Sequence, residues 1–261
     1  MMFKSSFGSL EYELRGPTDA PILVFTHGLG MDRASFRPQA DYFSKHYQVL
    51  LWDLPYRNGA FEERRFSFEM LSEVLIELLD HLSARQVFHI GHAHGGFFGQ
   101  YFAIRHPERV RGLVEIGSLP LVRLTPLRAW FLKLRTYALG LLPEKVYFRR
   151  HAREKALNSA ARIYLYKQGL TLGKGRLLEL EREALDAILK RPEGQVSVPT
   201  LVLCGSQDRA SIKRHAEIWD AVQPFAEQQV VEGGSHLCML DNPGDCNEKI
   251  ETFLKDHIQA A

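Results

Sequence analysis

Short apolar segments alternate with amphipathic segments along much of this 261-residue chain. Each apolar segment is closely followed by glycine or proline, which suits a buried strand. The intervening segments carry apolar residues three or four positions apart, as helices do. We expect strands at 21–26, 47–52, 86–90, 110–116, 200–204 and 228–231. This alternation predicts an α/β fold, with a mostly parallel twisted sheet and helices on both faces.

Residues 119–195 interrupt this pattern, because they show helical periodicity and no convincing strand. We therefore expect residues 1–118 and 196–261 to form the α/β core. Residues 119–195 would be a helical cap, inserted at the carboxyl edge of the sheet. Ligands bind at that edge in open α/β folds.

The composition excludes several classes of protein. A net charge of +2 gives no electrostatic footprint for nucleic acid. No apolar run approaches the ~18 residues of a membrane span, and the N-terminal residues lack the apolar core of a signal peptide. Three cysteines, Cys204, Cys238 and Cys246, cannot all pair and lack metal-type spacing. We expect a cytoplasmic protein, either a monomer or a homodimer, with no membrane span.

The segment Gly91–Gly96 lies between an expected strand and an expected helix and reads GHAHGG. A nucleophile elbow has the pattern Gly-x-nucleophile-x-Gly at such a position. The glycines are needed because the turn is too tight for side chains on either side of the nucleophile. Here Ala93 stands at the centre, and its methyl group cannot attack a substrate.

Four motifs of this kind each follow an expected strand. They are HGLG at 27–30, GHAHGG at 91–96, GSQD at 205–208 and GGSH at 233–236. Together they resemble the α/β-hydrolase family, specifically its serine esterase and lactonase branch with a helical cap. The nucleophile, acid and histidine occur in the order typical of that family. The resemblance covers almost the whole chain.

The resemblance implies a role for each motif. Position 93 would be the nucleophile site, His236 the general base, and Asp208 the group that orients His236. Glu115, near the end of a strand, is the alternative acid. The backbone amides of Leu29 and His94 would form an oxyanion hole. No metal or organic cofactor is implied.

The implied activity is hydrolysis of a carboxylic ester or lactone of a small apolar or amphiphilic substrate through a Ser-His-Asp triad. Ala93 then indicates a chain inactivated by a Ser-to-Ala substitution. Alternatively, Ala93 is natural and the protein binds ligands without turnover. Amide, thioester or C–C bond hydrolysis, or an Asp nucleophile as in epoxide hydrolases and dehalogenases, remain further alternatives.

The insertion also suggests how substrate is bound. Residues 119–195 hold 16 basic and 7 acidic residues, a net charge of +9. This excess predicts attraction of an anionic substrate or weak contact with an anionic membrane surface. The candidate substrate-binding residues are His27, His92, Trp130, Tyr137 and Leu237.

Overall fold

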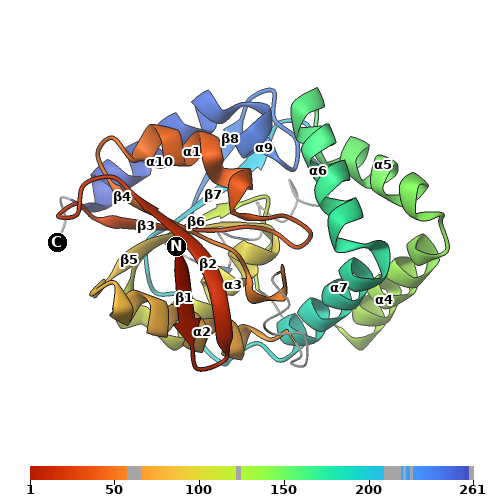
Figure 1. Ribbon diagram of the computed structural model, residues 1–261, viewed down its shortest axis with the longest axis horizontal. Helices are drawn as coiled ribbons and strands as arrows, with labels where there is room; N and C mark the ends of the chain where they lie inside the picture. The colour runs from red at the N-terminus through yellow and green to blue at the C-terminus, as the bar shows by residue number, and fades with distance from the viewer. Residues whose placement is uncertain (58–65, 122–124, 209–218, 220–221, 224–225, 259–261) are drawn as a thin grey trace.

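An eight-stranded sheet forms the centre of the computed structural model (Figure 1). The structure describes residues 1–57, 66–121, 125–208, 219, 222–223 and 226–258. The strand order is β1-β2-β4-β3-β5-β6-β7-β8. The pairs β1–β2 and β2–β4 are antiparallel, and every pair from β4–β3 to β7–β8 is parallel. The predicted α/β fold is therefore confirmed.

The strands follow the apolar segments closely. Their bounds are β1 Met2–Ser5, β2 Gly8–Arg15, β3 Ile22–Thr26, β4 Gln48–Trp52, β5 Val87–His92, β6 Val110–Ile116, β7 Thr200–Gly205 and β8 Ala226–Val231. β5 runs two residues beyond its expected end, because its pairing with β6 continues as far as His92 and Ile116. The chain leaves the sheet only at Ala93.

Helices cover both faces of the sheet. Figure 1 shows α1 (Arg37–Phe43) and α10 (Pro243–Ile258) on one side, and α2 (Phe68–His81) and α3 (His94–Arg105) on the other. Each pair closes its own apolar cluster against the sheet. The short helices are η1 Arg33–Phe36, η2 Pro55–Arg57, η3 Pro107–Arg109 and α9 Cys238–Asp241. Each face of the sheet therefore has its own core.

Four helices lie beside this core, and we call them the cap helices. They are α4 Pro126–Gly140, α5 Glu144–Lys155, α6 Ser159–Leu172 and α7 Lys174–Leu189. α5 packs on α6 and α4 packs on α7. In the described part of 119–195 there is no strand. Leu177 and Leu178 of α7 join the apolar cluster of α2 and α3, so the cap is packed onto the core.

Asp32 connects the cap to the loop that follows β3. Its carboxylate accepts hydrogen bonds from the Tyr164 hydroxyl, at 2.8 Å, and from the Gln168 side-chain amide, at 2.7 Å. Both partners lie on α6. The same carboxylate accepts from the backbone amide of Ala34 and so caps η1. One half-buried side chain thus fixes both the loop and the cap helix.

We predict that Asp32→Ala lowers the free energy of unfolding by about 1–3 kcal/mol, because it removes a helix cap and leaves two polar groups without their partner. Denaturant unfolding followed by circular dichroism measures this change. The matched control is Asp19→Ala, at an exposed position, which should change stability by no more than about 0.5 kcal/mol. Equal effects of the two variants would contradict this role of Asp32.

Candidate active site

The backbone at Ala93 has a conformation that residues other than glycine rarely adopt. Its φ is 50° and its ψ is −109°. The glycines on either side have no room for a side chain. A Cβ at Gly95 would lie 2.1 Å from the Thr26 carbonyl oxygen, and one at Gly91 would lie 2.5 Å from the Gly95 backbone. This is the elbow geometry that the GHAHGG motif predicts.

Hydrogen bonds hold the elbow in this conformation. The Ala93 amide donates to the Ile116 carbonyl of β6 at 2.9 Å, and the Ser118 hydroxyl donates to the Ala93 carbonyl at 3.1 Å. α3 begins at His94, so the amides of its first turn point back toward position 93. Those of Gly96 and Phe97 donate to the Ala93 carbonyl, whereas those of His94 and Gly95 come before the first bonds of the helix. Position 93 therefore lies at the positive end of a helix, where negative charge is stabilised.

Asp208 and His236 meet at the end of the sheet. His236 Nδ1 lies 3.4 Å from Asp208 Oδ2, and both side chains are almost fully buried. Backbone hydrogen bonds join their two loops: Gln207 N donates to Gly234 O at 2.8 Å, and Ser206 N donates to Val231 O at 2.9 Å. The 3.4 Å separation places the imidazole next to the carboxylate, the arrangement in which an acid orients a histidine.

His236 also lies close to the elbow. A Cβ at Gly117, which follows β6, would be 3.1 Å from His236 Nδ1. The His92 and His236 rings meet edge to face with centroids 4.9 Å apart. His92 Nε2 donates to the His236 carbonyl at 3.1 Å, so His92 helps to position the main chain of the histidine loop. Burial first, and then the neighbouring His236, hold the pKa of His92 well below its usual value.

His27 is fully buried beneath the loop that contains Leu29. Its Nε2 accepts from the Leu54 amide at 3.0 Å, and its Nδ1 then carries the proton donated to the Gly28 carbonyl at 2.9 Å. This ring joins the HGLG loop to the loop that follows β4. Leu177 of α7 covers the same loop, since a Cβ at Gly30 would lie 3.2 Å from Leu177 Cδ1. His27 supports the loop and is removed from solvent.

A cap residue that the motifs did not point to reaches this site. The carbonyl of Lys155, at the end of α5, accepts from the Ser235 hydroxyl at 2.7 Å and from the Leu237 amide at 3.0 Å. These two bonds lie on either side of His236. Burial first, and then the charge of Lys155, lower the pKa of His94 to about 4. The cap therefore contacts the histidine loop directly and brings a positive charge to the site.

The remaining predicted substrate-binding residues lie in different places. Leu237 is buried next to His236. Trp130 and Tyr137 lie on α4 with 55% and 70% of their surface exposed. Together with Leu178 they line a hollow of about 480 Å³ between α4 and α7. The structure thus brings His27, His92 and Leu237 to the site but places Trp130 and Tyr137 on the exposed side of α4.

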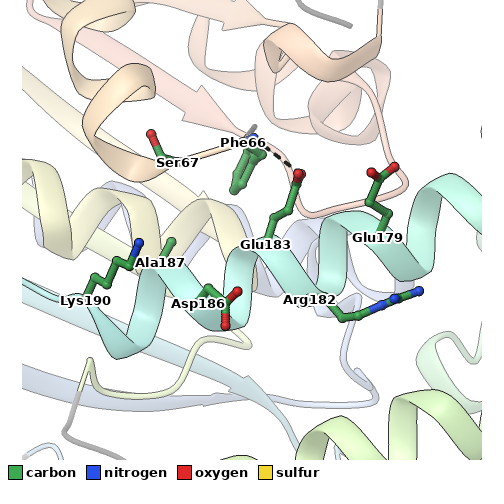
Figure 2. A pocket seen from close by; sticks show the side chains of 8 residues that line it. All are labelled: Phe66, Ser67, Glu179, Arg182, Glu183, Asp186, Ala187 and Lys190. Atoms are coloured by element: carbon green, nitrogen blue, oxygen red, sulfur yellow. Dashed lines mark hydrogen bonds between the residues drawn. The ribbon is translucent and has the colours of Figure 1, made fainter. Parts of the chain in front are cut away.

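A second hollow, of about 320 Å³, lies between the start of α2 and α7. Figure 2 shows the side chains that line it. The Phe66 amide donates to Glu183 Oε2 at 3.3 Å across it. Charged side chains line much of its wall, among them Arg182 and Asp186 of α7 and Lys190 just after this helix. None of the residues around it belongs to the four motifs, so it is separate from the elbow.

Glu115, the alternative acid, lies elsewhere. It is fully buried on β6, and a Cβ at Gly96 of α3 would come within 2.1 Å of its Oε2. Gln100 of α3 donates to the same oxygen at 3.3 Å. Glu115 therefore faces α3, whereas Asp208 lies beside His236. Burial raises the pKa of Glu115 to about 8, so the buried carboxyl group is mostly protonated at pH 7.

Two negative findings concern the described residues only. They contain no group of three or more His, Cys, Asp or Glu side chains that could hold a metal ion. They also contain no helix with the length and apolarity needed to cross a membrane.

We predict that Ala93→Gly raises the free energy of unfolding by about 1 kcal/mol, because relief of backbone strain exceeds the entropic cost of glycine. Thermal and denaturant unfolding measure the change. The control is Ala103→Gly, in a regular turn of the same α3, which should lower stability by about 1 kcal/mol or more. Destabilisation by both variants to the same extent would show that Ala93 is not strained.

We predict that Glu115→Gln changes how stability depends on pH. Between pH 4.5 and about 8 the folded protein keeps a proton that the unfolded chain releases, so the free energy of unfolding falls as pH rises. Glutamine does not titrate, so Glu115→Gln removes this fall in the free energy of unfolding. Relative to the parent chain, the gain should be absent near pH 4 and reach on the order of a few kcal/mol at pH 8. The exposed Glu248→Gln is the control, and a gain independent of pH would contradict this assignment.

Comparison with known proteins places this chain in a family. Residues 21–243 match the family described as alpha/beta hydrolase fold. The chain is 25% identical over 253 residues to 3-oxoadipate enol-lactonase 2 of Acinetobacter baylyi, covering 95% of this chain and 93% of that protein. It is 22% identical over 245 residues to a pimeloyl-[acyl-carrier protein] methyl ester esterase of Hamiltonella defensa, covering 90% and 93%.

Solved structures show the same fold. A thermophilic esterase from Thermogutta terrifontis superposes with a TM-score of 0.80 at 18% identity, over 98% of each chain. The enol-lactonase from Burkholderia xenovorans gives 0.71 at 17% identity, over 98% of this chain and 100% of that one. The resemblance drawn from the four motifs is confirmed. The chain belongs to the α/β-hydrolase family, among relatives that include esterases and lactonases.

Proposed function

We propose that this site is built to hydrolyse a carboxylic ester or lactone through an acyl-enzyme on a serine at position 93. With Ala93 the chain keeps the binding site and lacks the nucleophile. The observation that carries this proposal is the strained backbone at Ala93. A strained residue persists only where its surroundings impose it, and such residues cluster at functional sites. The strained turn exposes the side chain at position 93 to substrate. An alanine methyl group has no use for this exposure, whereas a serine hydroxyl could attack the substrate.

The proposed reaction uses the groups around the elbow in turn. With serine at position 93, its oxygen attacks the carbonyl carbon while His236 takes its proton. The carbonyl oxygen becomes an oxyanion, which the amides of Leu29 and His94 stabilise. The tetrahedral intermediate then collapses, the bond to the leaving oxygen breaks, and His236 returns the proton to that oxygen. Water deacylates the serine by the same steps, while Asp208 stabilises the imidazolium.

The preferred substrate is a small amphiphilic ester or lactone. Esters and lactones are named in the activities of the two relatives above. Leu177 and Leu237 supply apolar contact at the site. The charge of Lys155 acts on both His92 and His94, which favours a substrate that carries a carboxylate. None of the three cysteines forms a disulfide, and all three are buried, which supports a cytoplasmic location.

We predict that Ala93→Ser raises kcat for p-nitrophenyl ester hydrolysis by several orders of magnitude, since removing a triad nucleophile costs on the order of 10⁶ in kcat. The measurement is a paired assay of the two chains over a range of acyl lengths and simple lactones. In the serine background, His236→Gln should remove the gain, and Asp208→Asn should reduce kcat by on the order of 10⁴. No gain on any substrate would overturn the proposal.

A second function is favoured by one observation, namely Ala93 itself. A chain with this residue can bind a small amphiphilic ligand without turning it over. Titration calorimetry with esters, lactones and their product acids separates the two functions. Binding by the unaltered chain, together with inactivity of both Ala93→Ser and Ala93→Asp, would support the binding role. The aspartate variant also tests the epoxide hydrolase and dehalogenase alternatives.

A further inference from the structure

The outer face of α4 is an exposed apolar surface. Six large apolar side chains on and just after this helix are 46–72% exposed. They are Leu127, Trp130, Phe131, Leu134, Tyr137 and Leu141. Their spacing of three and four residues places them along one side of the helix, where they form a continuous stripe. Single exposed apolar residues are common, but contiguous patches of this kind mark an interaction surface.

α4 contacts the rest of the protein along the side opposite the stripe and along one edge of the stripe, where Trp130 and Tyr137 border the hollow toward α7. Leu139 is packed against the apolar cluster of the core. Lys133 forms an ion pair with Asp186 of α7 at 3.0 Å. The side of α4 that faces the core is therefore already packed, and the stripe is a separate, exposed surface. Helical spacing places Lys133 on one edge of the stripe and Arg135 on the other, and both are exposed.

Positive charge extends from this stripe onto α5. The two helices together contain eight basic and two acidic residues. Lys145, Arg149 and Arg153 recur every four residues on α5, and all three are exposed. Figure 1 shows α4 and α5 on the side of the cap away from the sheet, with α6 and α7 between them and the core. The most basic helix of the cap therefore lies on the same outer side as its most apolar exposed surface.

We propose that the α4–α5 face docks on an anionic lipid surface. Aromatic and leucine side chains on one face with basic residues beside them are typical of helices that lie in the membrane interface. Each basic residue near such a surface adds to the attraction. A second copy of this chain is a poorer occupant, because pairing two such faces brings like charges together. This docking is independent of the hydrolytic function proposed above.

The test uses sedimentation with vesicles of phosphatidylcholine, alone or with about 30% phosphatidylglycerol. The unaltered chain should bind the anionic vesicles at least tenfold more tightly than the neutral ones, and about 0.5 M NaCl should reduce binding about tenfold or more, because salt screens the attraction. Tryptophan fluorescence gives a second readout. Trp52 and Trp219 are buried, so a blue shift on binding reports Trp130.

Two pairs of substitutions separate the apolar and electrostatic contributions. Trp130→Gln with Phe131→Gln should lower binding about tenfold or more, and Arg149→Gln with Arg153→Gln should remove the preference for anionic vesicles. Ile163→Gln is the matched control, because Ile163 is 56% exposed on α6 and lies outside the stripe. All variants change exposed residues, and unchanged melting temperatures verify that they fold.

Other results would overturn the docking proposal. One is the absence of vesicle binding at low salt. Another is binding that neither salt nor either pair of substitutions weakens. A third is a concentration-dependent dimer, measured by light scattering, that the Trp130 and Phe131 substitutions abolish while vesicles remain unbound. That last result would assign the face to self-association.

Discussion

The tight turn between β5 and α3 is the constraint on which the rest of the site depends. The backbone at Ala93 must adopt a positive φ because β5 ends beneath it and α3 starts above it. Gly91 and Gly95 allow this approach, since any side chain there would collide with main-chain atoms. The consequence is chemical as well as structural. The turn raises one side chain above the sheet and aims the first amides of a helix at it.

The other groups of the site are fixed by main-chain contacts around this turn. Hydrogen bonds link the Asp208 loop to the histidine loop, and His27 links the Leu29 loop to the loop after β4. The cap then contacts these loops at three points: Lys155 at the histidine loop, Asp32 through α6, and Leu177 over Gly30. A change in the position of the cap would therefore displace both the His236 loop and the Leu29 loop. In the proposed reaction, substrate binding and the orientation of His236 would therefore both depend on the same helices.

Much of the fold could be predicted from the sequence because its signals are local. Apolar runs closely followed by glycine or proline indicate the parallel strands. Serine is a preferred helix cap, and Ser67 takes this place at the start of α2, where it accepts from the Met70 amide. The amphipathic segment between β3 and β4 is divided into η1 and α1, since Pro38 lies at the start of α1 and lacks an amide hydrogen. α9 is too short for periodicity to indicate it. The segment between β7 and β8 falls largely outside the described residues.

The placement of aromatic residues in the cap could not be predicted in the same way. Periodicity shows that α4 has an apolar side, but it does not show whether that side faces the core or solvent. The sequence analysis placed Trp130 and Tyr137 at the substrate site, whereas the structure places them on the exposed side. The protonated state of Glu115 depends likewise on burial beneath α3, which only the tertiary structure reveals.

Positive and negative residues are distributed more unevenly along this chain than its small net charge suggests. A net charge of +2 conceals a segment at 119–195 with +9, and the rest of the chain is correspondingly negative. Within the cap the positive charge is divided again. Acidic residues of α7 pair with some of the cations, as in the Lys133–Asp186 and Arg176–Glu179 pairs.

α5 has few acidic residues, so most of its cations face solvent. One end of that basic helix, at Lys155, contacts the histidine loop. The helix itself lies with α4 on the outer side of the cap. In the two proposals, α5 therefore favours an anionic substrate at the site and an anionic lipid surface on the outer side of the cap. The two roles are separable because different residues carry them.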